Sequence, residues 1–402
     1  MNRHLAAIAL VAMGAALAAT GAADTTPATA QAAAAVPASA PAGAGSGSPA
    51  AAQASGPGKG GADAGARFTH FRVGNKNVKA IYADGEIMWV ATSGGLIRYE
   101  PRTDKFKLYD ATNGLLSNGI FFVGRIQGRI TVGTYGGGMS ILDEKTQTWE
   151  NYNIPEGLGD AFVYGVLEAS NGDIWIATWS GVNRVRGGKL KDRAQWELHT
   201  VESTKGGLPN DWVYGLAEGK NGEIWLATEG GMARFANARW ESWNHARGIG
   251  APYAKVKNDI AYKNDPSQAS QHHAQQKKDM GLEDVDQAYN PNYIVSLAVD
   301  ADGTVWAGTW GGGVAHFDGT EWRNLTTAEG LPGNHVFMLH RDRLNRLWIG
   351  TNNGLARRKG DGFEVMKVED GLFANAVFSM ATLPDGSLWI GSYGGVAHIV
   401  PR

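Results

Sequence analysis

The sequence predicts an all-β protein, a seven-bladed β-propeller of four-stranded blades. A short pattern recurs in which Trp stands between two aliphatic residues and is followed by Ala or Gly and then Thr or Ser. Most copies lie about 41 to 50 residues apart, which is the period of a four-stranded propeller blade. Gly is abundant at 56 residues, as a chain with many tight turns requires. The copies are centred on Trp89, Thr131 (in place of Trp), Trp175, Trp225, Trp306, Trp348 and Trp389.

The N-terminus has the pattern of an export signal. Arg3 precedes an apolar run from Leu5 to Ala19, and small residues suited to cleavage occur near position 22 and again near position 30. An uncleaved membrane anchor is the alternative, but the Ala-rich run is short and weakly hydrophobic for a membrane span. Residues 1–22, with cleavage up to residue 30 left open, are therefore predicted to be a signal peptide of a periplasmic or secreted protein. No membrane insertion is expected after cleavage.

Residues 23–66 consist almost entirely of Ala, Gly, Ser, Pro, Thr and Gln. They have no apolar period and little to bury, so they are predicted to be a disordered linker. The propeller is expected to occupy residues 67–402.

Each repeat then reads as four strands, a to d. A hairpin dipeptide such as Asn171-Gly172 separates strand a from strand b, because Asn-Gly tolerates the positive φ angles of a two-residue β-turn. Strand b carries the recurrent Trp, which is expected in the core between blades. Strand c carries a recurrent basic residue, which is expected to be structural. These basic positions are Arg98, Arg184, Arg234, His316, Arg357 and His398.

Six strands d follow seven strands b, so one strand d is missing at the C-terminal end. Residues 67–71 match the strand d pattern of residues 239–243 and stand before the first strand a at Val78. We therefore expect the N-terminal strand, at about residues 67–73, to pair with the last blade and close the ring.

One interval breaks the period. Trp225 and Trp306 lie about twice as far apart as neighbouring copies usually do. The excess falls at about residues 253–290, between strand d of one blade and strand a of the next, and it is polar. This segment is predicted to be an insertion on the same face as the b-to-c turns.

The candidate binding site is predicted on that face. Blades need the same packing residues but not the same ligand contacts, so positions that vary between repeats are the informative ones. The residue after the recurrent Thr or Ser varies, and aromatic rings beside amide and carboxylate groups suit sugar rings or flat polar ligands. The predicted ligand-binding residues are Tyr135, Trp179, Glu229, Trp310, Asn352 and Tyr393, with Trp212 and His335 from neighbouring loops. The alternative is that these side chains only pack against neighbouring loops.

Other chemistry has weaker support in the sequence. His272 and His273 in the insertion could bind a metal, but no ligand spacing supports it, so a solvated loop is favoured. His335 and Glu229 could form an acid–base pair, an arrangement that arises easily by chance among many repeats. We expect no catalytic residues, no metal and no cofactor. The net charge of −2 argues against a nucleic-acid partner.

The repeated Trp-[Ile/Val/Leu]-[Ala/Gly]-Thr-x-x-Gly, with Gly-Leu-x-x-Asn before strand a as at Gly114 to Asn118, resembles the two-component regulator propeller repeat. The resemblance extends over about Phe68 to Val400. It implies an exported ligand-binding sensor, often of glycans, in signalling systems. No kinase or DNA-binding module follows the last repeat, so the stand-alone form is expected and only fold and ligand binding carry over.

The resemblance thus implies a non-enzymatic protein that recognises a small molecule, glycan or protein at the mouth of the central channel. A separate membrane sensor kinase is a possible partner. Two alternatives stay open. One is a lyase resembling the seven-bladed streptogramin lyases, and the other is a scaffold that binds another exported protein.

Overall fold

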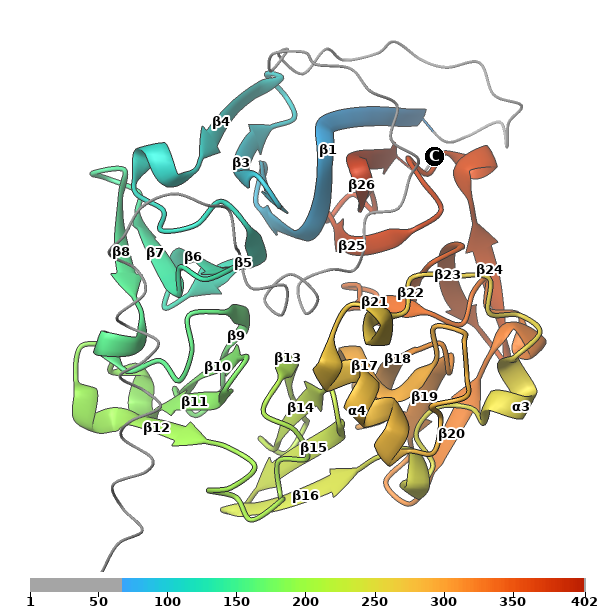
Figure 1. Ribbon diagram of the computed structural model, residues 1–402. Coiled ribbons are helices and arrows are strands. Elements are labelled where there is room, and N and C mark those ends of the chain that lie inside the picture. Colours follow the sequence, from blue (N-terminus) through green and yellow to red (C-terminus); the bar gives the residue numbers. More distant parts are fainter. Residues whose placement is uncertain (1–66, 401–402) are drawn as a thin grey trace, which may run out of the picture.

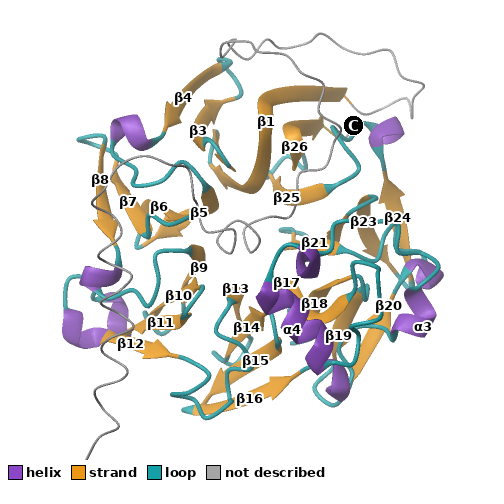
Figure 2. Ribbon diagram, in the orientation of Figure 1, coloured by secondary structure: helices purple, strands orange, loops and turns teal. Residues whose placement is uncertain are grey.

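The computed structural model describes residues 67–400, so the predicted signal peptide and linker lie outside the described residues. Strands hydrogen-bond into six antiparallel sheets that are arranged around a central axis (Figure 1). One strand of each repeat lies nearest the axis and the other strands follow outward (Figure 2). Within residues 67–400, no helix is long and apolar enough to cross a membrane.

Five of the sheets have four strands each, as the repeat period predicts. The second and third repeats form β5 (Ile120–Ile126), β6 (Arg129–Thr134), β7 (Met139–Asp143) and β8 (Thr148–Tyr152), then β9 (Val163–Glu168), β10 (Ile174–Thr178), β11 (Gly181–Val185) and β12 (Trp196–His199). The fourth repeat forms β13 (Val213–Glu218), β14 (Ile224–Thr228), β15 (Gly231–Ala236) and β16 (Arg239–Trp243). The fifth and sixth form β17 (Asn290–Val299), β18 (Val305–Trp310), β19 (Val314–Phe317) and β20 (Trp322–Leu325), then β21 (Val336–Arg341), β22 (Leu347–Thr351), β23 (Gly354–Lys359) and β24 (Gly362–Met366).

The remaining sheet corrects the predicted architecture. It has six strands in the order β25-β26-β1-β2-β3-β4, so the hydrogen-bonded sheets number six and not seven. These strands are β25 (Val377–Thr382), β26 (Leu388–Val400), β1 (Arg67–Asp84), β2 (Ile87–Thr92), β3 (Gly95–Glu100) and β4 (Lys105–Tyr109). The prediction of seven separate four-stranded blades is therefore wrong, because the first and last repeats share one sheet.

The closure also differs from the predicted one. Residues 67–72 do pair with β26, with Arg67 opposite Val400 and Arg72 opposite Gly395. They are not a separate outer strand, however, because β1 continues through a register shift and pairs with β2 from Val78 to Asp84. A single strand of 18 residues thus joins the two ends of the repeat array.

Strand b is buried on both faces in every repeat. In β14 all five residues are buried, and the Trp225 ring packs with Phe317 of the neighbouring sheet. The basic residue of strand c packs against the recurrent Trp ring of strand b. The Arg234 guanidinium lies 5.5 Å from the Trp225 ring centroid, and His316 stacks on Trp306 at 4.7 Å. The recurrent Trp and basic residues therefore belong to the packing of the fold.

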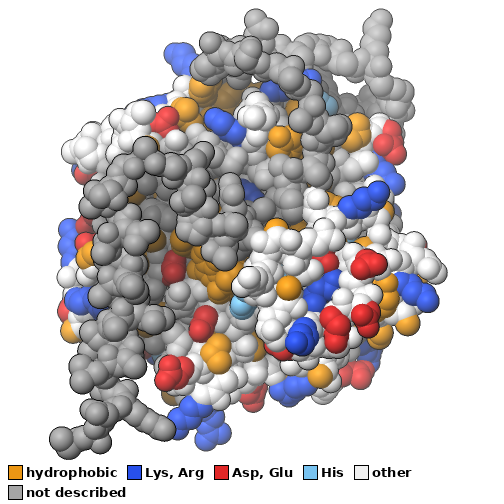
Figure 3. All heavy atoms as spheres, viewed as in Figure 1, with side chains coloured by type: hydrophobic (Ala, Val, Ile, Leu, Met, Phe, Trp, Pro, Cys, Tyr) orange, Lys and Arg blue, Asp and Glu red, His pale blue; other side chains and the backbone are white. Residues whose placement is uncertain are grey.

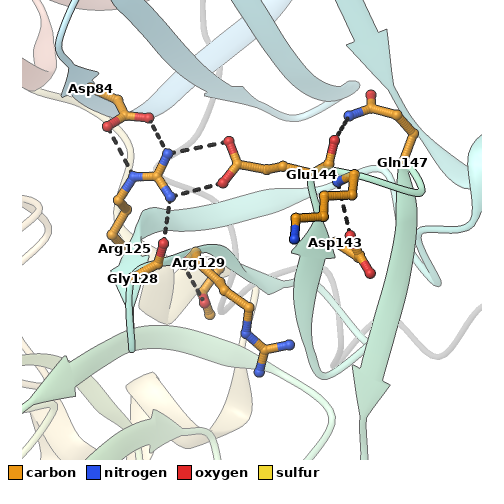
Figure 4. A network of polar contacts seen from close by, with 9 residues as sticks. Asp84, Arg125, Gly128, Arg129, Asp143, Glu144 and Gln147 are labelled. Atoms are coloured by element: carbon orange, nitrogen blue, oxygen red, sulfur yellow. Dashed lines mark hydrogen bonds and ion pairs between the residues drawn. The ribbon is translucent and has the colours of Figure 1, made fainter.

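Polar bonds tie neighbouring sheets together on the face that carries the a-to-b turns. Figure 4 shows one of these junctions, where Arg125 of β5 reaches Asp84 at the end of β1. Its Nε and Nη2 donate to the Asp84 carboxylate at 2.9 and 2.6 Å, and Nη1 donates to Glu144 at 2.9 Å. These bonds hold the pKa of Asp84 below its usual value. Further around the ring, Arg341 pairs with Asp300 at 2.7 Å.

Short helices lie between the strands. Most are single 3-10 turns, and two α-helices lie between β16 and β17, in the segment predicted to be an insertion. The 3-10 turns are η1 (Ala111–Asn113), η2 (Ile154–Glu156), η3 (Arg186–Gly188), η4 (Arg193–Gln195), η5 (His245–Arg247), η6 (Pro266–Gln268), η7 (Thr327–Glu329) and η8 (Val368–Asp370). The α-helices are α3 (Tyr253–Val256) and α4 (Gln271–Asp279). In Figure 2, α4 lies over the face of β17 and β18.

Candidate functional site

The b-to-c turns place the variable residue of each repeat. In β14, the Thr228 hydroxyl donates to the Gly231 carbonyl at 2.8 Å and accepts from the Gly230 amide at 3.1 Å. Gly231 has a φ of 129°, and a Cβ there would lie 2.1 Å from the Trp243 carbonyl oxygen, so only Gly fits. This bonding recurs in the other repeats that have Thr, which fixes the position of the residue that follows it. We call the face with these turns the mouth face.

A β-bulge in every strand next to the axis provides a second set of variable positions. In β9, Val163 pairs with Thr178 and Gly165 pairs with Ala177, so Tyr164 is the extra residue. A bulge redirects the side chain of its extra residue. The same shift recurs around the ring and leaves extra residues that we call the bulge positions. They are Lys79, Phe121, Tyr164, Tyr214, Val295, Phe337 and Phe378.

The side chains at the bulge positions contact one another across sheet boundaries. Phe121 lies 4.6 Å from Tyr164, centroid to centroid, and Tyr164 lies 5.0 Å from Tyr214. Phe337 and Phe378 are 5.3 Å apart. Burial raises the pKa of the Tyr164 and Tyr214 phenols. The five aromatic bulge positions therefore form two groups of rings in contact near the axis, which we call the aromatic layer.

Above this layer, four aromatic residues form a continuous row that we call the aromatic rim: Tyr135, Phe162, Trp179 and Trp212. Consecutive ring centroids are 4.6, 4.7 and 4.6 Å apart, and each pair meets edge to face. All four side chains are half-buried, so part of each ring faces solvent. Figure 3 shows hydrophobic side chains gathered near the middle of this face, beside a histidine. The structure thus brings together three of the predicted site residues, Tyr135, Trp179 and Trp212.

Glu229, another predicted site residue, lies under the insertion and is fully buried. Tyr214 donates a hydrogen bond of 2.7 Å to Glu229 Oε2. On the other side, His273 Nδ1 of α4 contacts Glu229 Oε1, and His272 Nε2 lies 3.6 Å from the same oxygen. His273 is 2% exposed. The expectation of a solvated loop at His272 and His273 is therefore wrong, because α4 docks these imidazoles on the mouth face.

His272 also extends the aromatic rim. Its ring stacks on Trp212 at a centroid distance of 4.1 Å. Burial lowers the pKa of His272, and Glu229 opposes that shift. The insertion therefore supplies one end of the aromatic surface.

Trp310 and His335 are also buried beneath the insertion. Trp310 stacks on Tyr293 at 5.2 Å, and Tyr262 of the insertion packs against both Trp310 and His335. His335 Nε2 bonds to the Ala288 carbonyl at 2.6 Å, and burial lowers the pKa of its imidazole to about 4. These two residues support the insertion, and His335 does not meet Glu229 in an acid–base pair.

The last two predicted site residues stand apart from the rim. Asn352 Oδ1 accepts a hydrogen bond from the His335 backbone amide at 3.3 Å. The Asn352 backbone amide donates to the His335 carbonyl at 3.0 Å. Tyr393 is half-buried and pairs with Asn77 of β1. The predicted set is therefore divided into an open rim, a buried layer under the insertion and two residues beside them.

The sequence reasoning missed the bulge positions and the two histidines. The signal for the bulge positions was present, since the second residue of each strand a is aromatic in most repeats. The contact between His273 and Glu229 joins residues 44 positions apart and had no periodic signal.

Two surface hollows lie away from the rim. These hollows, of about 460 and 450 Å³, adjoin each other near β8 and share Tyr152, Leu190 and Lys191. Their lining mixes basic and acidic side chains, and they contain none of the predicted site residues.

Comparisons with known proteins concern the repeats and the fold. The two-component regulator propeller family model matches residues 157–180, 207–230, 288–311 and 330–353, so the chain contains repeats of this kind. Each matched segment extends from the loop before strand a to the b-to-c turn. The first carries Phe162, Tyr164 and Trp179, and the second carries Trp212, Tyr214 and Glu229. The comparison with curated proteins found no match.

Solved structures share the fold. Two extracellular domains of proposed hybrid two-component systems from B. thetaiotaomicron are 18% and 17% identical, with TM-scores of 0.60 and 0.57. The aligned regions cover 82% and 81% of this chain but 40% and 38% of those domains, so this chain spans about two fifths of their length. A streptogramin B lyase is 13% identical with a TM-score of 0.58, over 84% of this chain and 98% of the lyase.

Proposed function

We propose that this chain, which contains two-component regulator propeller repeats, is an exported, non-catalytic binding protein that recognises a ligand at the aromatic rim. The observation that carries the proposal is the unbroken edge-to-face row from Tyr135 to Trp212, with part of every ring open to solvent. Exposed aromatic surface that is contiguous marks binding sites more often than isolated apolar side chains do.

The rim suits a ligand with a flat or ring-shaped apolar face, such as a sugar ring or an aromatic small molecule. Ring faces and edges supply stacking contacts, and nearby polar groups supply orientation. Ser180 and Asp160 lie beside the rim, with Ser180 Oγ donating to Asp160 Oδ2 at 2.8 Å. Both belong to the loops that also carry Phe162 and Trp179, so they can bond to polar groups at the edge of a stacked ring.

A lyase is the second candidate, and the observation that favours it is the contact between His273 and Glu229. Imidazole and carboxylate groups in contact can transfer protons. Both side chains are almost entirely buried beneath α4, however, so a substrate would have to displace the insertion to reach them. The open rim therefore favours recognition over catalysis.

The sensor role rests on the likeness of the repeats to extracellular sensor domains. A separate membrane kinase is the partner that this role requires, and export to the periplasm or to the outside follows from the N-terminal pattern. Co-purification of the membrane fraction on the immobilised propeller, with and without ligand, tests the kinase partner. Recovery of the mature chain from the cytoplasm would contradict export.

The ligand-binding proposal is tested by calorimetry with a panel of neutral oligosaccharides and aromatic compounds. Trp179→Ala should weaken the binding of every ligand found by at least tenfold. Phe106→Ala is the matched control, because Phe106 is an exposed aromatic residue on the outer strand β4 and should have no effect. Equal affinity of wild type and Trp179→Ala would place the site elsewhere.

A further inference from the structure

In the second to sixth repeats, the aromatic residue of the outer strand packs on the loop that precedes strand a of the same repeat. A Cβ on Gly157 would lie 2.7 Å from Trp196 Cδ2, and one on Gly207 would lie 2.3 Å from Trp240 Cβ. The corresponding pairs are Gly114 with Trp149, Gly248 with Trp322 and Gly330 with Phe363. In these repeats the loop and the aromatic ring therefore cover each other, and the closest contacts leave room only for Gly.

The first repeat lacks this loop. In four of the other repeats the loop is a 3-10 turn, η1, η2, η5 or η7, which ends at a Gly with a φ between 99° and 137°. A buried Leu or Ile follows that Gly. No such turn precedes strand a of the first repeat, because β1 passes as one strand from its pairing with β26 to its pairing with β2. We call residues 72–77, where β1 changes partners, the seam.

The aromatic residue of the first repeat, Phe106, is therefore left uncovered. It lies opposite Tyr99 of β3, in the register that Trp322 has in its own repeat. Opposite residues of antiparallel strands share a face, and the Tyr99 ring contacts Phe71 of β1 at 4.8 Å, so Phe106 stands on the face turned toward β1. The Phe106 side chain is nevertheless 51% exposed, whereas Trp322 is 7% exposed. Leu108, on the same face of β4, is 36% exposed.

The surface around Phe106 is rich in cations. From Arg72 to Lys79, β1 has three cationic residues and no acidic one. Arg72 is exposed, and so are Lys105 and Lys107, which stand on either side of Phe106 in β4.

Two acidic residues lie in the hairpin of β3 and β4. Glu100 accepts a hydrogen bond from Arg98, whose charge it balances, and Asp104 accepts one from the Tyr99 hydroxyl at 2.8 Å. Lys107 donates to the neutral side chain of Gln147 at 2.7 Å. The cations therefore outnumber the acids on this surface, which favours a partner with acidic residues.

The loops of the other repeats show which backbone fits such a ring. Glu156 and Glu329 stand directly before Gly157 and Gly330, and Leu follows in both loops. A segment of the form Glu-Gly-Leu therefore offers the glycine that close approach to the ring requires, together with an acidic charge that suits the basic surroundings.

We infer that Phe106 and Leu108 form a docking surface for another protein, and that the docked segment is an acidic turn of the form Glu-Gly-Leu, which covers the seam from outside as the loops cover the other repeats. Aromatic side chains are enriched in the cores of protein interfaces, and enclosing Phe106 removes apolar area from water. β4 lies at the outer edge of the ring (Figure 1), so this surface is separate from the aromatic rim. The inference goes beyond the proposed ligand site and does not depend on it.

The test uses a fluorescein-labelled peptide with the sequence of residues 326–333, Thr-Thr-Ala-Glu-Gly-Leu-Pro-Gly, and measures its fluorescence anisotropy as the full chain is added. We expect saturable binding that Phe106→Ala weakens at least tenfold. The peptide with Gly330→Ala should bind at least tenfold more weakly, because a Cβ would meet the ring. The peptide with Glu329→Lys should also bind more weakly, because it brings a cation to a basic surface. Leu344→Ala is the matched control, since Leu344 is 70% exposed in the turn between β21 and β22 and should have no effect.

Phe106→Ala removes an exposed ring, so the variant should keep the wild-type fold, which circular dichroism checks. Absence of peptide binding, or binding that Phe106→Ala leaves unchanged, would overturn the docking surface. Equal binding of the unchanged and Gly330→Ala peptides would overturn the assignment of a glycine turn as the partner. Sedimentation of the full chain tests a second copy as the occupant, because a dimer that Phe106→Ala abolishes would replace the proposed partner.

Discussion

Trp179 and Trp212 meet edge to face at a centroid distance of 4.6 Å and an interplanar angle of 77°. They come from different sheets, since Trp179 follows β10 and Trp212 precedes β13. The contact therefore joins two neighbouring sheets at the mouth face as well as forming part of the rim. The proposed binding site and the packing of the two sheets therefore share the same pair of rings.

A double-mutant cycle should detect this pair. We expect Trp179→Ala and Trp212→Ala to be coupled by about 0.5–1.5 kcal/mol in the free energy of unfolding, because aromatic pairs contribute about that much beyond burial. Urea denaturation of the wild type, both single variants and the double variant measures the coupling. Strict additivity would mean that the two rings do not support each other.

Arg125 should contribute more to the free energy of unfolding than the neighbouring Arg129 does. Arg125→Met removes the bonds to Asp84 and Glu144 and should cost about 2–3 kcal/mol, since hydrogen bonds to charged groups are worth more than neutral ones. Arg129→Met is the control, because its ion pair with Glu150 is more exposed and should contribute less than about 1 kcal/mol. Chemical denaturation of both variants measures the two losses of unfolding free energy. Equal losses would contradict the prediction.

The insertion should depend on one buried ion pair. Lys277 Nζ lies 2.6 Å from Asp265 Oδ2 and also donates to the Gln287 carbonyl at 3.1 Å, and both charged side chains are buried. Lys277→Met leaves a buried carboxylate without its cation, which typically costs about 3–5 kcal/mol. Limited proteolysis should therefore cut the insertion of Lys277→Met much faster than that of wild type. The neighbouring, exposed Lys278 is the control, and cleavage of Lys278→Met at the same raised rate would contradict the role of the pair.

Acid should weaken the fold through His335. The imidazole pKa is lowered from 6.5 to about 4 in the folded chain, so the unfolded chain takes up a proton at higher pH than the folded one. The stabilisation is complete above pH 6.5 and is lost as the pH falls towards 4, by at most about 3 kcal/mol. His335→Gln should flatten this part of the stability curve. Denaturation midpoints between pH 7.5 and pH 4 measure how steeply stability falls with pH in wild type and in His335→Gln. Equal slopes in the two proteins would contradict a buried, neutral His335.

Lys79 should reduce the stability of the folded chain at neutral pH. Its pKa is lowered to about 8 by desolvation, so the folded state disfavours the charged form. Lys79→Met should raise the free energy of unfolding at pH 7 by about 1–3 kcal/mol. The gain should shrink as the pH rises from 8 towards 10.5, where the wild-type lysine is neutral in the folded chain. A destabilised Lys79→Met would show that the interactions of the lysine in the folded chain outweigh the cost of its desolvation.

The sequence predicted the repeats well because their packing residues recur. Trp225 and Trp306 occupy the same place in β14 and β18, and five of the repeats supply four strands each. The number of sheets was predicted wrongly, because the sequence was divided between residue 73 and Val78, whereas β1 continues through Gly74 and Asn75. The continuity of a strand depends on having partners on both sides, which a local pattern does not reveal.

The candidate site was predicted less completely. Variation after the recurrent Thr identified Tyr135 and Trp179 on the open rim. The same rule also selected Glu229 and Trp310, which the insertion buries. The position of the insertion depends on long-range contacts such as that of His273 with Glu229, and a polar helix with little amphipathic character gave no indication of them.

The continuity of β1 links the closure of the ring to the first repeat. Residues 67–72 pair with β26, and Val78 to Asp84 of the same strand pair with β2. A force that pulls residue 67 away from β26 would therefore pass along the backbone into the strand that holds the first repeat. In this chain, the strand that joins the two ends of the array is also the path by which a mechanical load at residue 67 would reach the inside of the ring.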